Sequence, residues 1–275
     1  MMQPLRILWA KSAMVFLGLG LFLLFFPACQ DEPAAINSVV LAGGAYVRIE
    51  NREDSTSLAA LNSNVFSLEI WAAGDILPFG VGESPALFMI GNEQGGDEIG
   101  IYRLPTDSSQ IFVFIGNQFM GFYSIPGCDW NDPEIFTQVV VTYDGTGVSV
   151  YGNGESLGSA VISRDLNIGA SDALIGADWD ALNDETTLNN FWYGAIDEVR
   201  LWTIVLPSSE MQFRYQNPGK LTRTYSATGL DPLLGLWRFN EAGGDGDLEP
   251  DGSGNGNVGV LNAGAGTLAF SPEGA

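Results

Sequence analysis

Carboxylates are the side chains with which this sequence could do acid–base chemistry, because it contains no histidine. The absence of imidazole excludes Ser-His-Asp and Cys-His hydrolysis and zinc held by histidine. Retaining glycoside hydrolysis needs two carboxyl groups about 5 Å apart on one face. Asp197 and Glu198 are adjacent, so in a strand they point to opposite faces unless a bulge intervenes, and Glu69 stands alone between apolar neighbours. The sequence therefore predicts no catalytic residue.

Two tryptophans lie in polar loops rather than in strand-like sequence. A tryptophan exposed beside Asp and Asn can stack on a sugar ring while its neighbours hydrogen-bond to the sugar hydroxyls. The alternative is that each indole ring packs against a sheet edge as part of the core. The candidate ligand-binding residues are Asp129, Trp130, Asn131, Asp178, Trp179 and Asp180.

Short apolar alternations position these loops. Residues 45–49, 66–71, 111–115 and 139–143 alternate with period two, are rich in β-branched and aromatic residues, and are separated by Gly, Asn, Asp and Ser. Such a pattern is typical of an all-β sandwich or barrel.

Turns and a single helix complete the predicted elements. The dipeptides Asp-Gly at 144–145 and Asn-Gly at 153–154 are typical of hairpin turns. Residues 208–215 form the one stretch that reads as a helix, with a start signal at Pro207 and Ser208 and a stop signal in Asn-Pro-Gly at 217–219.

The first 28 residues resemble an export signal. Arg6 and Lys11 precede an apolar run over residues 12–28 that ends in a small residue. The alternative is a membrane-spanning anchor, because the run approaches the length that crosses a bilayer. We expect a cleaved signal, followed by a tether over residues 29–37 and one domain over residues 38–275.

Cys29 follows this run directly, in the sequence Phe-Pro-Ala-Cys, which resembles a bacterial lipobox. The resemblance implies that Cys29 carries lipid and anchors the chain to the outer membrane. The acidic residues after it resemble the surface-export signal of some Bacteroidota lipoproteins. A Cys29–Cys128 disulfide is the alternative, since exported proteins can form one; with a lipidated Cys29, Cys128 is an unpaired, buried thiol.

The chain is strongly acidic, with 33 Asp and Glu against 11 Lys and Arg and a formal net charge of −22. Such a surface repels nucleic acid and anionic lipid headgroups, so we expect neither as a partner and expect membrane contact through the lipid alone.

Three passages resemble the laminin-G-like family of the concanavalin-type lectin/glucanase superfamily. They are Gly-Gly-Ala-Tyr-Val-Arg-Ile at 43–49, the run from Phe136 to Gly154 with its two hairpin turns, and Trp-Tyr-Gly-Ala-Ile-Asp-Glu-Val-Arg-Leu-Trp at 192–202. With Leu-Asn-Ile-Gly at 166–169 they follow the family's order over residues 39–215. The resemblance implies a jelly-roll sandwich of two antiparallel sheets.

A fourth passage resembles the segment that often opens such a domain, yet here it lies near the C-terminus. It comprises Gly-Leu-Trp-Arg-Phe-Asn-Glu at 235–241 and Asp-Gly-Ser-Gly-Asn-Gly-Asn at 251–257. A truncated second domain is one interpretation. We expect instead that residues 232–262 complete the sandwich, since about 40 residues could hardly bury a core alone. Residues 243–256 read as a long Gly/Asp loop.

The family resemblance also implies a structural Ca²⁺ ion that joins the chain ends. Asp197 matches the family's ligand aspartate, and Gly-rich loops can turn oxygen ligands toward a cation. The alternative is that Asp197 accepts hydrogen bonds from backbone amides and binds no metal. The candidate ligands are Asp197, Glu241, Asp251 and Asn255.

The sequence thus favours a non-catalytic surface lipoprotein that binds a glycan or glycoprotein, as an adhesion or capture module. Two alternatives remain: a structural or protein-interaction component of an envelope complex, and a degenerate glycoside hydrolase. An aromatic-lined groove would favour the first function, an apolar patch the second and two facing carboxylates the third, because fold alone does not decide between them.

Overall fold

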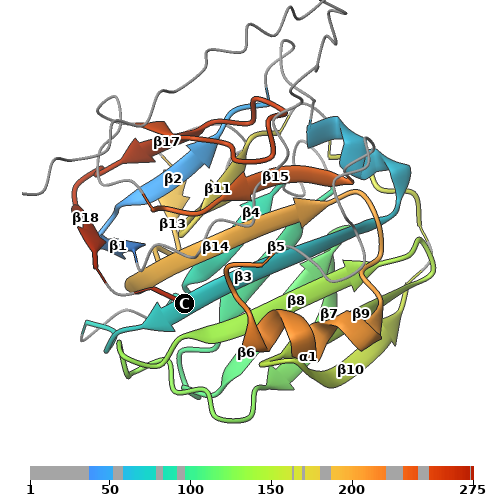
Figure 1. Ribbon diagram of the computed structural model, residues 1–275, viewed down its shortest axis with the longest axis horizontal. Coiled ribbons are helices and arrows are strands. Elements are labelled where there is room, and N and C mark those ends of the chain that lie inside the picture. Colours follow the sequence, from blue (N-terminus) through green and yellow to red (C-terminus); the bar gives the residue numbers. More distant parts are fainter. Residues whose placement is uncertain are drawn as a thin grey trace, which may run out of the picture.

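The computed structural model describes residues 37–51, 58–78, 83–91, 97–162, 164–168, 171–179, 187–220, 232–240, 248–272, 274 and 275. Over these residues two antiparallel sheets pack face to face, with a short two-stranded ribbon beside them (Figure 1). The predicted all-β, two-sheet sandwich is confirmed. The predicted signal segment, Cys29 and the tether up to residue 36 lie outside the described residues, as do Asp180 and Glu241.

Sheet A has the order β10-β9-β8-β3-β14-β1-β18, and β15 also pairs with β14. Its strands are β1 (Ser38–Ala42), β3 (Phe66–Gly74), β8 (Thr137–Tyr143), β9 (Gly147–Gly152), β10 (Glu155–Val161), β14 (Gly194–Trp202), β15 (Leu233–Trp237) and β18 (Thr267–Ser271).

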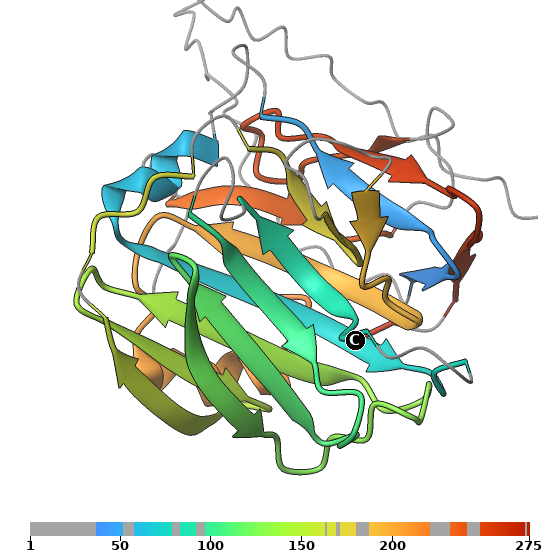
Figure 2. The ribbon, with the colours of Figure 1, turned by 180° about the vertical axis from the view of Figure 1, so that it is seen from behind.

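Sheet B, in front in Figure 2, has the order β16-β17-β2-β11-β4-β5-β6-β7. Its strands are β2 (Tyr46–Ile49), β4 (Ala86–Ile90), β5 (Ile99–Arg103), β6 (Gln110–Ile115), β7 (Gln118–Ser124), β11 (Ala173–Ile175), β16 (Leu248–Glu249) and β17 (Gly259–Asn262). The ribbon pairs β12 (Asp178–Trp179) with β13 (Leu188–Asn189).

The alternation in the sequence decides which side chains enter the core. In β6, Ile111, Val113 and Ile115 are buried between the sheets, whereas Phe112 and Phe114 lie on the outer face. The Asn153-Gly154 turn joins β9 to β10 with both residues at positive φ, as the hairpin prediction requires.

The predicted helix is confirmed as α1 (Ser208–Gln216), which begins after Pro207 and ends at Asn217. It packs on the outer face of sheet A through Leu206 and Met211, which contact a buried cluster with Trp202 (Figure 1). A 3₁₀ helix, η1 (Leu58–Ser63), has no counterpart among the predicted elements. No helix in the described ranges has the length and hydropathy that crossing a bilayer requires.

The C-terminal segment supplies strands to both sheets. β3 pairs with β14 along its whole length, so β1 and β15 share the opposite edge of β14, β1 beside Gly194–Ile196 and β15 beside Val199–Trp202. β17 pairs with β2, and β18 pairs with β1. Strand β16 interrupts the stretch that reads as a loop in the sequence.

Candidate functional site

Four phenylalanines form an aromatic patch on the outer face of sheet B. Phe112 and Phe114 come from alternate positions of β6. Phe119 and Phe122 of β7 lie opposite them although they are three residues apart, because the pairing register shifts by one residue between them and Gly121 adopts φ +135°.

These rings contact one another and solvent. The Phe119 and Phe122 ring centroids are 4.9 Å apart, and Phe119 lies 5.8 Å from Phe114. Phe119 is 48% and Phe122 58% exposed. Tyr102 of β5 extends the patch, since its ring stacks on Phe112 at 5.1 Å with an interplanar angle of 13°. We call these five residues the aromatic face; a contiguous exposed apolar surface of this kind marks an interaction site.

Tyr102 brings two carboxylates to the end of the aromatic face. Its hydroxyl oxygen lies 2.7 Å from Glu98 Oε1 and 3.1 Å from Asp178 Oδ2. The ring can lie flat along the strand because Gly100 has no Cβ, which would stand 2.5 Å from Tyr102 Cε2. Burial, together with the charges of Asp178 and Glu98, holds the pKa of Tyr102 well above its usual range, so the hydroxyl stays protonated.

Asp178 is therefore the predicted ligand-binding residue that the structure brings to the aromatic face. It also accepts a hydrogen bond from Asn190 Nδ2 at 3.2 Å. Its neighbour Trp179 is 2% exposed and packs in a cluster with Tyr46 and Leu174, with the Arg48 guanidinium 5.9 Å from its ring centroid. Stacking of Trp179 on a sugar ring is thus excluded in this conformation, and that prediction is wrong.

The Trp130 loop is corrected in the same way. Trp130 is fully buried and packs edge to face on Trp192 at 5.4 Å, because its loop folds onto the glycine at the end of β3. Asp129 Oδ1 accepts the backbone N–H of Asn131 at 3.0 Å, and Asn131 Oδ1 accepts from Arg103 at 2.6 Å. The loop is anchored from below rather than open for stacking.

The sequence matches the concanavalin A-like lectin/glucanases superfamily over residues 41–212, well over half of the chain. The chain belongs to this superfamily. The laminin-G-like resemblance and the concanavalin-type sandwich are thereby confirmed.

Solved structures show the same fold at low sequence identity. A candidate carbohydrate-binding protein from Bacteroides ovatus ATCC 8483 superposes with a TM-score of 0.59 at 15% identity over 88% of this chain, which spans 61% of that protein. The heptameric SAP-like pentraxin of Limulus polyphemus gives a TM-score of 0.48 at 11% identity, over 73% of this chain and 92% of that one. No curated protein matches the sequence.

Glu69, which stands alone in the sequence, lies in a buried ion-pair network. Its carboxylate accepts hydrogen bonds from Arg214 of α1, from Arg200 at 3.3 Å and from Gln138 at 2.8 Å. Although burial opposes ionisation, Arg214 and Arg200 hold the pKa of Glu69 below its usual range. This carboxylate is neutralised and shut off from solvent, so it cannot act on a substrate.

A bulge does intervene at Asp197 and Glu198. Glu198 has φ +47°, and β14 gains an extra residue against β3 at this point. Glu198 consequently shares Arg200 with Glu69 and also accepts from Arg238 at 2.9 Å.

Asp197 lies where the two ends of the domain meet. Its carboxylate accepts the backbone N–H of Glu198 at 2.7 Å and of Ala275 at 2.9 Å. Asp197 Oδ2 and the carbonyl oxygen of Asn37 both lie within 2.8 Å of the position that a Cβ on Gly274 would take, so the two oxygens are at most about 5.6 Å apart. The Asn37 amide in turn donates to the carbonyl of Asn240.

The predicted Ca²⁺ ligands do not come together. Asp251 accepts the N–H groups of Leu236 and Asn257, and Asn255 donates to Leu233, so both serve the turn beside β15 near the far end of β14. Glu241 lies outside the described residues, and in the described part of the chain no three acidic, Cys or His side chains gather as a metal site.

A different oxygen set around Asp197 does fit the ion that the superfamily implies. Asn240 Oδ1 is buried without a hydrogen-bond partner. Burial and the neighbouring Glu198 raise the pKa of Asp197 to about 8, so its charge is poorly compensated. Carboxylate, amide and carbonyl oxygens are the ligands that Ca²⁺ takes.

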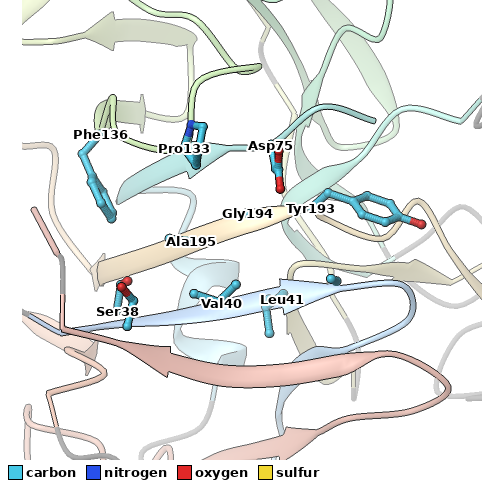
Figure 3. Close-up of a pocket in the computed structure, with 11 residues that line it drawn as sticks. Ser38, Val40, Leu41, Asp75, Pro133, Phe136, Tyr193, Gly194 and Ala195 are labelled. Carbon is cyan, nitrogen blue, oxygen red and sulfur yellow. The ribbon is translucent and has the colours of Figure 1, made fainter. Parts of the chain in front are cut away.

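A pocket of about 180 Å³ opens on the outer face of sheet A, beyond the part that α1 covers (Figure 3). Val40 of β1 and Ala195 of β14 line its floor, while Phe136 and Pro133 form one wall. Figure 3 shows this wall on one side of β14 and Val40 on the other. The wall continues from the Trp130 loop, which the sequence singled out.

The sequence reasoning missed the aromatic face. Its signal was available: Phe112 and Phe114 occupy the outward positions of a strand, where a solvent-facing sheet carries polar residues. Glu98 carried no such signal, because only the folding of β5 against the β12–β13 ribbon brings it to Asp178.

Proposed function

We propose that this protein binds a glycan, or the glycan part of a glycoprotein, on the aromatic face of sheet B. The observation that carries the proposal is the exposed, contiguous set of rings bordered by Glu98 and Asp178. The apolar C–H faces of a sugar pack on aromatic rings, and its hydroxyls donate to carboxylates, so this combination suits a sugar.

The fold agrees with this proposal. The Bacteroides ovatus protein that shares the sandwich is a candidate carbohydrate-binding protein. We place the present protein at the cell surface, held to the outer membrane by lipid on Cys29, where it acts as an adhesion or capture module.

Catalysis is not part of the proposed function. Glu98 Oε1 and Asp178 Oδ2 are at most about 5.8 Å apart, since both contact the Tyr102 hydroxyl, and this separation resembles the about 5 Å of a retaining glycosidase. Glycoside hydrolysis is therefore the second candidate. Tyr102, however, is 3% exposed and its hydroxyl oxygen occupies the space between the two carboxylates, where the reacting sugar would have to lie.

We further propose that Asp197 and Asn240 hold a structural Ca²⁺ ion, with backbone carbonyls at Asn37 and Asn240. The ion would supply positive charge to the buried Asp197 carboxylate and join β14 to the segments that begin and end the domain. It would take no part in ligand binding on sheet B.

A glycan array probed with the purified full chain tests the glycan proposal. We expect binding to a restricted set of glycans, and a loss of roughly tenfold or more for Phe119→Ser/Phe122→Ser, the scale expected when apolar contact area is removed. Val161→Ser is the matched control, because Val161 is 94% exposed on β10, away from the aromatic face.

Two results would contradict the proposal. One is a double variant that binds the array as the wild type does. The other is release of reducing sugar from a bound glycan, abolished by Glu98→Gln, which would establish the hydrolase instead.

A further inference from the structure

We propose that the pocket on sheet A is a second binding site, which receives one apolar side chain from a basic segment of a protein partner. It lies on the opposite sheet from the aromatic face, so it does not depend on glycan binding.

The floor of the pocket is hollow because its strand residues are small. Ala42 ends β1, and Gly194 and Ala195 begin β14. Gly194 has no freedom to be larger, because a Cβ would stand 2.1 Å from the Ala73 carbonyl oxygen. The close approach of β14 to β3 therefore leaves a depression on the outer face.

The walls are apolar and preformed. Phe136 and Pro133 belong to the loop that Trp130 anchors in the core. Arg103, 2% exposed, fixes the same loop to the opposite wall by donating to Asn131 Oδ1 at 2.6 Å and to the Asp75 carbonyl oxygen at 2.9 Å. A site that is rigid before binding avoids the entropy cost of ordering its walls.

The size and lining fit a side chain better than a sugar. A volume of about 180 Å³ is below the about 300–1,000 Å³ of pockets that enclose whole small ligands. Val40, Ala195, Pro133 and Phe136 offer no side-chain hydrogen bond, whereas a sugar needs several convergent polar groups.

The charge of the rim selects the partner. Asp75 lines the pocket, and Asp132 and Glu134 flank Pro133 in the wall. Arg103, the cation beneath this loop, is buried and committed to the two hydrogen bonds that fix the walls. With a net charge of −22 over the whole chain, this rim attracts a segment in which Lys or Arg flanks the apolar residue.

Selection from a displayed library of random nine-residue peptides against the purified full chain tests this site. We expect enriched peptides to share one apolar residue with Lys or Arg beside it, and to bind more weakly as salt is added. Ala195→Phe, which fills the pocket, should weaken an enriched peptide by roughly tenfold to a hundredfold, the loss expected when one apolar side chain loses its buried site.

Phe136→Ser removes a wall from a half-buried loop position and gives a second measurement if Ala195→Phe fails to fold. Val161→Ser should bind the peptide as the wild type does. The proposal is overturned if no peptide is enriched, if enriched peptides are acidic, or if both pocket variants bind them normally. It is also overturned if these two variants lose glycans on the array, since the pocket would then belong to the glycan site.

Discussion

Asp197 shows how a single buried carboxyl group can need a partner that the chain itself does not supply. It has hydrogen bonds to two backbone N–H groups, yet burial and Glu198 still raise its pKa to about 8. Its neighbours on the other side are oxygens, including the unpaired Asn240 Oδ1. A divalent cation would satisfy both.

This arrangement predicts that millimolar Ca²⁺ stabilises the protein relative to EDTA. At free Ca²⁺ a hundredfold above its Kd, the gain is about 2.7 kcal/mol, enough to raise the melting temperature by a few degrees in a domain of this size. Asp197→Asn should melt at the same temperature in both buffers. Asp251→Asn should melt lower than wild type, because its turn loses hydrogen bonds, and should still respond to Ca²⁺.

A wild type without any shift would mean that Asp197 only anchors the residues around Ala275. A response lost in Asp251→Asn but kept in Asp197→Asn would place the ion in the Gly-rich turn, as the sequence first suggested.

At the scale of elements, α1 is held to sheet A by charge as well as by apolar packing. Arg214 is fully buried, pairs with Glu69 and lies over the Trp202 ring at 4.9 Å from its centroid. Removing one member of a buried pair leaves its partner charged in the interior, which is far more costly than losing a solvated pair.

Arg214→Ala should therefore lower the free energy of unfolding by about 3–5 kcal/mol. Arg164→Ala is the comparison, because the Arg164–Asp97 pair is short, at 2.6 Å, but the Arg164 side chain is 37% exposed; its loss should cost about 1 kcal/mol. Urea unfolding of the two variants measures both. Equal losses would show that the buried network adds nothing beyond an ordinary ion pair.

The sequence predicted elements better than the places where they meet. Alternation identified β6 and β8, and the Pro207 and Asn217 signals bounded α1, because both patterns depend on local backbone geometry. Burial of the Trp130 ring depends on a close approach to Gly74, and the meeting of Glu98 with Asp178 depends on strands 80 residues apart in the chain. Neither contact has a local signal, so the candidate site was largely misplaced.

The C-terminal passage was the informative exception. Its likeness to an opening segment suggested that residues 232–262 join the main sandwich, and β15, β16 and β17 do lie in the two sheets. The partner strands still required the structure, because pairing between distant segments leaves no periodicity in either one.

At the scale of the whole molecule, the two proposed sites lie on opposite sheets, so one protein could hold a glycan on sheet B and a protein segment on sheet A. Such a bridge has to be fixed to the cell, and Cys29 is the predicted attachment point. A clickable fatty acid supplied to growing cells should label the wild type and Cys128→Ser, whose thiol is buried, but not Cys29→Ser. Label retained in Cys29→Ser would disprove the anchor.

The central claim is that a glycan lies on the aromatic face, and nuclear magnetic resonance of the full chain with ring-labelled phenylalanine tests it directly. Titration with a glycan selected on the array should move the ring signals of Phe119 and Phe122, assigned by substitution, and leave that of Phe136 unchanged. Because Phe136 lines the pocket on the other sheet, the same label reports on both sites. Saturable binding that leaves Phe119 and Phe122 unmoved, or that moves Phe136 instead, would contradict the account.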